Sequence, residues 1–225
     1  MPWLPWYGEM KQVLSWTEFL AARGSSILSA TGEHLLLSLG AVLLGTLIAV
    51  PLGILLARHE QVASVVLGIS GTIQTIPSLA FFGFVLPFLG IGVVPAMTVL
   101  FLYSILPILR NTYTGIREVS PAYLEAGVGM GMNRRQLLTW IQFPLAFPVI
   151  MSGIRVSTVY IISWATLSAL IGAGGLGDPI LAGIHTYDAK LIIAGALPAA
   201  MLALLASWSL GLVERAVTPR GLRQR

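Results

Sequence analysis

The sequence lacks the side chains on which many enzyme and metal sites depend. Its 225 residues include no cysteine, which excludes disulfide bonds, thiolate metal ligands and a cysteine nucleophile. The three histidines, His34, His59 and His185, are scattered and have no metal-binding spacing. Charged residues make up only 10% of the chain, whereas ordinary soluble domains carry about 25%. We therefore expect a membrane protein that holds no metal and no cofactor.

Nucleotide-binding motifs are missing as well. No stretch matches G-x-x-x-x-G-K-[ST], the phosphate-binding loop of ATPases. The run from Gly172 to Gly177 matches G-x-G-x-x-G, but an apolar helix precedes it, and Asp188 follows only 11 residues after Gly177. A dinucleotide site needs a preceding strand and an acid about 20 residues further on. We interpret the run as a tight turn on the outer side, followed by a short helix with Asp178 as N-cap and Pro179 as first residue.

What the chain has in abundance is apolar sequence. Hydrophobic residues make up 56% of it, and the mean hydropathy is +0.86. The second of its apolar runs is interrupted by glycine and proline, so we expect other helices to bury it, because breaks at membrane depth are tolerated only inside protein or beside a water-filled cavity. The fold class expected is an all-α polytopic membrane bundle of about five transmembrane helices. The five runs cover residues 35–57, 62–92, 94–109, 145–170 and 191–213.

The regions around these runs divide the chain into three parts. Residues 1–32 carry aromatic and charged side chains, and we interpret them as an interfacial helix, with a disordered tail as the alternative. Residues 33–213 form one transmembrane domain, and residues 214–225 form a basic cytoplasmic tail. The pI near 9.8 does not indicate nucleic-acid binding, because the positive charges are scattered over loops.

The basic side chains also predict the orientation of the spans. If the loop at 120–144 is cytoplasmic, nine arginines lie inside, and only Lys11, Arg23 and Lys190 lie outside. Since positive residues beside spans stay on the cytoplasmic side, we expect the N-terminus outside and the C-terminus inside a bacterial plasma membrane. The nine are Arg58, Arg110, Arg117, Arg134, Arg135, Arg215, Arg220, Arg223 and Arg225.

The loop at 120–144, SPAYLEAGVGMGMNRRQLLTWIQFP, is a polar segment between apolar runs. Ser120 and Pro121 have the pattern of a helix N-cap and first helical residue. A short helix through Glu125 should follow. The glycines at 127, 129 and 131 then favour a turn, because glycine tolerates backbone angles that other residues avoid.

A second helix is expected to begin directly after this turn. Asn133 and Gln136 have the spacing of a capping box, and Pro144 marks the expected end of the helix. Arg134 and Arg135 lie at its N-terminus, where positive charge opposes the helix dipole. Two explanations remain open for them, a cytoplasmic location of the loop and a partner protein.

The spacing of residues in this hairpin resembles that of a known family. Glu125-Ala126-Gly127, then Gly131, then Ile141-x-Phe143-Pro144 is similar to the EAA signature, E-A-A-x3-G-x9-I-x-L-P, of permease subunits of bacterial ATP-binding-cassette (ABC) importers. The departures are Gly127 for the second alanine and Phe143 for leucine. The resemblance implies a type I importer permease fold and assigns coupling to the ATPase to Glu125, Ala126, Gly127, Gly131, Arg134, Arg135, Ile141 and Pro144.

The same resemblance implies partners for the chain. These are two cytoplasmic ATP-binding subunits, a second permease subunit, identical or paralogous, and an extracytoplasmic solute-binding protein. Membrane lipids surround the spans, and no nucleic acid is involved. ATP would be used by the partner subunits, since this chain has no motif for it.

Two further stretches are similar to permeases of glycine betaine, choline and carnitine importers. They are QTIPSLA at 74–80 and IGAGGLGDPI at 171–180, and with GMGMNRRQ and FPLAFPVIMSGIR they extend the resemblance over roughly 74–178. For QTIPSLA, a proline-broken helix whose polar groups only satisfy backbone is the alternative. The resemblance implies a pathway or gate role for Gln74, Thr75, Pro77, Ser78, Gly174 and Gly175.

The fourth apolar run carries a polar and aromatic stripe. Ser157, Tyr160, Trp164 and Ser168 have helical spacing on one face, which indicates a lined pathway whose rings attract cations. Packing between helices is the alternative. Arg155, inside the same span, is either a functional residue or a side chain that extends to the cytoplasmic headgroups.

Three classes of function remain open. The first is a transport permease driven by a separate ATPase. The second is an intramembrane serine enzyme, for which Ser163 and Ser168 are available but no base lies at matching depth. The third is a structural membrane subunit. We expect the first, with glycine betaine, choline or carnitine as solute and an amino acid or sulfonate as the alternative.

Overall fold

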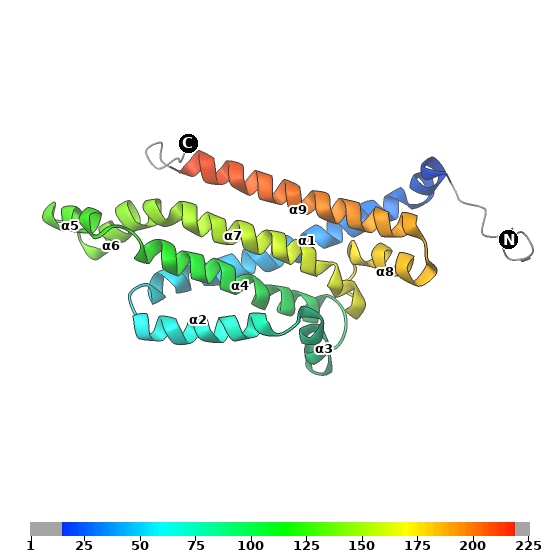
Figure 1. Cartoon of the computed structure of the whole chain (residues 1–225), viewed down its shortest axis with the longest axis horizontal. Coiled ribbons are helices and arrows are strands. Elements are labelled where there is room, and N and C mark those ends of the chain that lie inside the picture. Colours follow the sequence, from blue (N-terminus) through cyan, green and yellow to red (C-terminus); the bar gives the residue numbers. More distant parts are fainter. Residues whose placement is uncertain (1–14, 219–225) are drawn as a thin grey trace, which may run out of the picture.

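The computed structural model describes residues 15–218, which form helices and turns without a strand (Figure 1). Within this part of the chain, four helices are long and apolar enough to cross a membrane, and a bent pair makes a fifth candidate. This confirms the expected all-α bundle of about five spans. The elements are α1 (Trp16–Leu56), α2 (Glu60–Thr75), α3 (Ser78–Leu89), α4 (Val93–Arg117), α5 (Pro121–Gly129), α6 (Arg134–Gln136), α7 (Phe143–Ala165), α8 (Gly177–Thr186) and α9 (Ala189–Val217).

Helix α1 begins much earlier than the sequence suggested. Ser15 and Glu18 form a capping box at its start, with the Ser15 amide donating to the Glu18 carboxylate over 2.7 Å. The helix then runs unbroken to Leu56, so the expected boundary at residue 32 falls inside it. Residues 1–14 and 219–225 lie outside the described part, and the interfacial role of the N-terminal segment stays a prediction.

Helix α4 is the centre of the bundle, and α1 packs closely on it. A Cβ added at Gly45 would collide with the Ser104 hydroxyl, and one at Gly53 would lie 2.7 Å from Cβ of Thr112. The Ser104 hydroxyl also lies 3.2 Å from the Ala41 carbonyl oxygen, to which it donates. Small residues of this kind let two helix backbones approach inside a membrane, where no hydrophobic force drives helices together.

Helix α7 covers another side of α4 by the same means. A Cβ on Gly153 would lie 2.6 Å from Asn111 Cβ and 2.8 Å from the Pro107 carbonyl oxygen. One turn further along α7, the Ser157 hydroxyl donates to the Ser104 carbonyl over 3.0 Å. Figure 1 shows α1 behind α4 and α7, with α9 along α7 and α2 along α4.

The interrupted second run forms two helices that meet at 97°. The break falls at Ile76 and Pro77, as the proline predicted. Within this chain the run is buried only in part: Ala63 is the buried residue of α2, Phe81, Phe82 and Val85 are those of α3, and both helices pack mainly on α4. Most of their apolar surface is left exposed by this chain alone.

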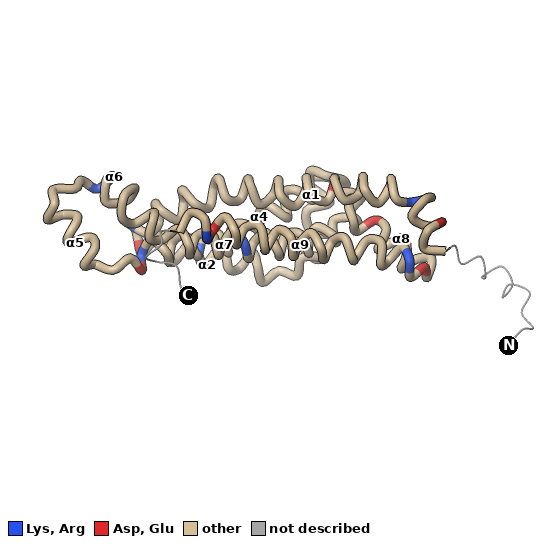
Figure 2. Tube along the Cα trace, turned by 90° about the horizontal axis from the view of Figure 1, so that it is seen from above, with Lys and Arg blue, Asp and Glu red and all other residues tan. Residues whose placement is uncertain are grey.

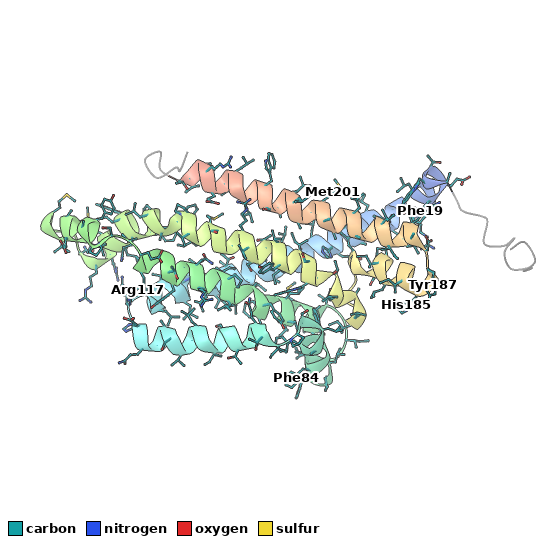
Figure 3. All side chains as sticks on the ribbon, viewed as in Figure 1. Phe19, Phe84, Arg117, His185, Tyr187 and Met201 are labelled. Atoms are coloured by element: carbon teal, nitrogen blue, oxygen red, sulfur yellow. The ribbon has the colours of Figure 1, made fainter. Side chains whose placement is uncertain are left out.

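The two ends of the bundle carry different structures. The hairpin of α5 and α6 projects beyond the other helices at one end, and α8 and the start of α1 lie at the other (Figures 1 and 2). An ion pair of 3.2 Å between Arg117 and Glu60 ties α4 to α2 near the hairpin. His185 and Tyr187 lie at the opposite end (Figure 3). The membrane-spanning helices thus separate two polar ends.

The packing of α7 on α4 can be tested at Gly153. We expect Gly153→Ala to lower the free energy of unfolding by about 1–3 kcal/mol, because the new methyl group meets backbone that cannot move aside. Thermal unfolding in detergent measures this. The matched control is Gly68→Ala in α2, where nothing lies within 4 Å of the added Cβ. Equal melting temperatures for the two variants would contradict the close contact.

Candidate functional site

The hairpin at 120–144 is a helix, a glycine turn and a second helix, as the sequence predicted. Helix α5 runs to Gly129, and of the hairpin glycines at 127, 129 and 131 only Gly131, which follows the helix, has a positive φ, 81°. The Met132 amide donates to the Gly127 carbonyl over 3.0 Å, and the Gly131 amide donates to the Val128 carbonyl over 2.9 Å. This is the Schellman arrangement, which ends a helix with a left-handed glycine.

The second helix begins with the expected capping box. The Asn133 amide donates to Gln136 Oε1 over 2.8 Å, and the Gln136 amide donates to Asn133 Oδ1 over 3.0 Å. At the first helix, Ser120 takes the N-cap position but its side chain caps no amide.

The expectation that Pro144 ends this helix is wrong. A π-helical segment, Leu137–Gln142, precedes α7, and helix continues through the proline to Ala165. In the π-helical segment the Phe143 amide donates to the Leu138 carbonyl, five residues back. Because Pro144 follows directly in the first turn of α7, its missing N–H is tolerated. The second helix of the hairpin therefore continues into the membrane span without a break.

Gly127 is the point at which the hairpin closes on itself. A Cβ at this position would lie 2.6 Å from Leu137 Cδ2 and 2.8 Å from Ile141 Cδ1. Gly127, which replaces the second alanine of the signature, is thus in close contact with Ile141, the isoleucine of the same signature. Glu125, Ala126, Gly131, Arg134 and Arg135 are exposed, as are the large side chains Tyr123, Val128, Met130 and Trp140.

The break between α2 and α3 is held by Tyr103 of α4. Its hydroxyl donates to the Ile76 carbonyl, which the break frees from helical pairing. The Gln74 side-chain amide donates to the Tyr103 carbonyl over 3.1 Å. Protein groups therefore satisfy the backbone at membrane depth, as physical chemistry requires. Pro77 is the N-cap residue of α3, Ser78 begins that helix, and the exposed Thr75 hydroxyl donates back to Thr72.

The stripe predicted along the fourth span splits into two pairs. Ser157 and Ser168 are fully buried and bond to backbone carbonyls, so they pack between elements. Ser168 lies in a 3₁₀ turn, Leu167–Ile171, that follows α7, which moves it off the helical face. Tyr160 and Trp164 stack at 5.7 Å between ring centroids, and the Tyr160 side chain is 50% exposed. Tyr160 thus faces away from the core, whereas Trp164 packs against it.

The exposed side of α7 lies opposite α1. Its residues Ser152, Val156, Tyr160 and Ser163 are exposed, whereas Thr158, Ile161 and Ala165 are buried on the side toward α1. We call the surface formed by Ser152, Val156, Tyr160 and Ser163 the open face. Trp164 connects it to the α2–α3 break, because its ring lies 4.6 Å from that of Tyr103.

The glycine run at 172–177 is a tight turn clamped by α1. Gly174 and Gly175 have φ values of 80° and 84°. The Gly175 amide donates to Glu33 Oε2 over 3.1 Å, and a Cβ on Gly174 would lie 2.6 Å from the same oxygen. His34 is fully buried beside Gly175, and its Nε2 lies 2.9 Å from the Ile162 carbonyl. The turn is therefore held by α1, and His34 bonds α1 to α7 beside it.

The short helix after this turn begins two residues before its predicted start. Leu176 is the N-cap of α8, and Asp178 lies in the first turn without capping it, so the prediction of Asp178 as N-cap is wrong. Burial raises the pKa of the Asp178 carboxyl, and the nearby Glu33 carboxylate raises it further. The acidic pair thus sits at the end of the bundle opposite the hairpin.

The predicted site residues therefore form separate groups. The coupling residues gather at one end, and Gly174 and Gly175 lie at the other. Tyr103 links the break at Gln74–Ser78 to the pair Tyr160 and Trp164 between these ends. Tyr103, Glu33 and His34 were missed, because a single polar residue within an apolar run or just before one carries no spacing signal.

The chain matches a protein family over most of its length. Residues 49–220 match the family of binding-protein-dependent transport system inner membrane components. The chain belongs to this family. It is therefore a permease subunit of an ABC importer, a membrane-embedded multi-pass transport protein and not an enzyme.

Relatives of this permease are described in several bacteria. The glycine betaine/carnitine/choline transport system permease protein OpuCB of Bacillus subtilis is 50% identical over 168 residues, which are 75% of this chain and 77% of that protein. The carnitine transport permease protein OpuCB of Listeria monocytogenes is 48% identical over 75% of this chain and 78% of its own. The osmoprotectant import permease protein OsmW of Salmonella typhimurium is 45% identical over 75% and 80%.

Solved structures show the same fold at lower identity. A chain of the MetNI methionine ABC transporter in an inward-facing conformation superposes with a TM-score of 0.76, covering 86% of this chain and 96% of its own at 20% identity. A chain of an amino acid ABC transporter superposes with a TM-score of 0.71 at 19% identity, covering 88% and 96%. The type I importer permease fold is thereby confirmed.

The role of Tyr103 at the break can be tested by removing its hydroxyl. We expect Tyr103→Phe to lower the free energy of unfolding by about 1–3 kcal/mol, because the Ile76 carbonyl loses its partner inside the membrane. Hydrogen exchange at the start of α3 should rise as well. Tyr113→Phe on the same helix is the control, since the Tyr113 hydroxyl makes no hydrogen bond within residues 15–218. An unchanged exchange rate in Tyr103→Phe would contradict this role.

Proposed function

We propose that this permease carries glycine betaine, carnitine or choline into the cell. The observation that supports this most is the 45–50% identity to permeases named for these osmoprotectants, over three quarters of the chain. The stacked pair of Tyr160 and Trp164 is consistent with such cargo, because aromatic faces attract quaternary ammonium groups by about 0.5–2 kcal/mol. The half-exposed ring of Tyr160 makes this pair accessible from the open face.

The hairpin is the proposed contact with the ATPase. Its tip exposes Tyr123, Val128, Met130 and Trp140 around the charged side chains of Glu125, Arg134 and Arg135. Exposed aromatic and arginine side chains of this kind are typical of protein interfaces. Because the hairpin continues into α7 without a break, a force that the ATPase exerts on the hairpin would move α7, whose exposed side is the open face. Two permeases would present two such hairpins to two ATP-binding subunits.

The apolar surface of α2 and α3 supports a second permease, identical or paralogous. Val62, Val65 and Ile69 of α2 and Phe84 and Phe88 of α3 are exposed in the isolated chain. A second copy that covered this broken span would enclose the open face as a pathway. Membrane lipids would cover the remaining apolar exterior, such as Leu36, Leu43 and Leu47 on α1.

The orientation we propose places the hairpin in the cytoplasm and the N-terminus of α1 outside a bacterial plasma membrane. Arg58, Arg110, Arg117, Arg134 and Arg135 lie on the segments that meet at the hairpin end, which fits the preference of positive charge for the cytoplasmic side. The glycine turn would then face outward, toward a separate solute-binding protein.

Both orientation and docking can be tested in this cysteine-free chain. A membrane-impermeant maleimide should label Tyr187→Cys on intact cells and Gly129→Cys only after permeabilisation. Tyr187 is 96% exposed, and nothing lies within 4 Å of a Cβ on Gly129. Co-expressed ATP-binding subunits should protect Gly129→Cys and leave Tyr187→Cys unprotected. Labelling of Gly129→Cys on intact cells would reverse the proposed orientation.

The solute is tested by uptake. Cells that lack other osmoprotectant importers and express this chain with its partner subunits should accumulate labelled glycine betaine, carnitine or choline at high salt. Cells with the partners but without the chain are the control. Labelled methionine serves as an unrelated solute. Uptake of methionine and of none of the three quaternary ammonium solutes would refute the proposed cargo.

A further inference from the structure

Arg155 is a charged side chain in the middle of a membrane span. It lies 10 residues before the end of α7 at Ala165, which is about 15 Å along the helix. Its contact on α9, Ser207, lies 10 residues before Val217, again about 15 Å from that helix end. A cation at this depth is costly unless it has an anionic partner or water.

The structure leaves most of the Arg155 guanidinium unpaired. Nε donates to Ser207 Oγ over 2.9 Å. Among residues 15–218 no carboxylate lies within 4.0 Å of it, and its two terminal nitrogens have no hydrogen-bond partner. These nitrogens lie beside Gly211, where a Cβ would be 3.4 Å from Nη1 and 3.8 Å from Nη2. Ser207 therefore holds the group in place while its two-pronged end stays free.

The position of Arg155 around α7 places it beside the open face. At 100° per residue Arg155 lies about 60° around α7 from the exposed Ser152 and about 140° from Tyr160, so it faces α9 at the edge of the open face. The opposite side of the α7–α9 contact is a different surface, a groove of about 760 Å³ lined mainly by Leu, Ile and Val from α1, α7 and α9. Arg155 does not line that groove, and the one side-chain hydrogen bond that it makes within the described part of the chain goes to the Ser207 hydroxyl.

We propose that Arg155 binds the carboxylate of a zwitterionic solute as it passes the open face. The free ends of a guanidinium match a carboxylate in a two-pronged geometry. The proposal rests on the proposed function, and it divides the proposed solutes by chemistry. Glycine betaine and carnitine carry a carboxylate beside their quaternary ammonium group, whereas choline carries a hydroxyl. Arg155 then determines which osmoprotectants this permease passes well.

An anionic lipid at the hairpin end is the alternative partner, and the comparison of solutes distinguishes it from a solute carboxylate. Lipid phosphates lie at the membrane surface, about 15 Å from the centre of a 30 Å hydrocarbon core. The backbones of Arg155 and Ser207 lie about that far from the ends of their helices, but the terminal nitrogens of Arg155 reach Gly211, about 9 Å before the end of α9. A lipid contact would affect every solute alike, whereas a carboxylate site affects only the carboxylated solutes.

The test compares solutes with and without a carboxylate in the full importer. We expect Arg155→Gln to raise KM for glycine betaine and carnitine about 10- to 100-fold, the factor that a charge-assisted hydrogen bond is worth. KM for choline should change less than about twofold, within the usual range of surface substitutions. Arg155→Lys should retain part of the affinity, since it keeps the charge but not the two-pronged geometry.

Two matched variants separate binding from structure. Ser207→Ala should weaken uptake of carboxylated solutes in the same direction as Arg155→Gln, because Nε loses its partner. Ser209→Ala, two residues away on α9 with its hydroxyl bonded to Ala206, should have no effect. Assembly with the ATP-binding subunits is measured in parallel and should be unchanged in all variants.

The outcomes distinguish the proposals. Loss of choline and glycine betaine uptake to the same extent would mean that Arg155 serves folding or lipid contact, and unchanged KM for every solute would also overturn the inference. A wild-type importer that carries only choline would overturn it too. If the wild type carries only carboxylated solutes, the rise in KM at unchanged maximal rate is the deciding result. A wild type that carries none of the three refutes the proposed function itself.

Discussion

Close contact between helix backbones at glycine positions is the constraint on which this structure depends. Gly53 of α1 and Gly153 of α7 press on α4 at positions where even a methyl group would lie within 3 Å of neighbouring atoms. In a membrane such contacts replace the hydrophobic force that packs soluble helices. Because α4 holds both neighbours so closely, the hairpin at one end and the glycine turn at the other belong to one connected body. A movement of the hairpin or of the glycine turn must therefore be transmitted through the contacts of α1 and α7 with α4.

The broken span formed by α2 and α3 is the part of the bundle that this chain encloses least. Its freed backbone is satisfied from one residue, Tyr103, which also contacts the Trp164 ring. The remaining surface of α2 and α3 is exposed and apolar, so this chain by itself does not complete the membrane structure. The open face of α7 lies beside this incomplete region. The chemistry of transport is therefore expected where two subunits meet and not inside one of them.

Charge is scarce in this chain, and its few positions are informative. Most of the described arginines lie toward the hairpin end, whereas Arg23 lies at the other end with Glu33 and Asp178. Arg155 differs from these, since it belongs to the middle of α7 and bonds to the Ser207 hydroxyl of α9. A charged residue at such a depth persists in a folded membrane protein only with compensation. The two ends of the bundle and the level of Arg155 between them therefore differ in their charged groups.

The sequence by itself determined the helical class, the approximate spans, the hairpin with its capping box at Asn133, and the break at Pro77, because these depend on local hydropathy, capping and proline geometry. It did not determine that helix continues through Pro144, since a π-helical segment absorbs the proline only in the folded backbone. Nor did it separate buried Ser157 from exposed Tyr160, because helical spacing does not say which neighbour covers a face. The clamp by Glu33 and the support by Tyr103 join residues far apart in the chain. Only tertiary structure brings such groups within hydrogen-bond distance.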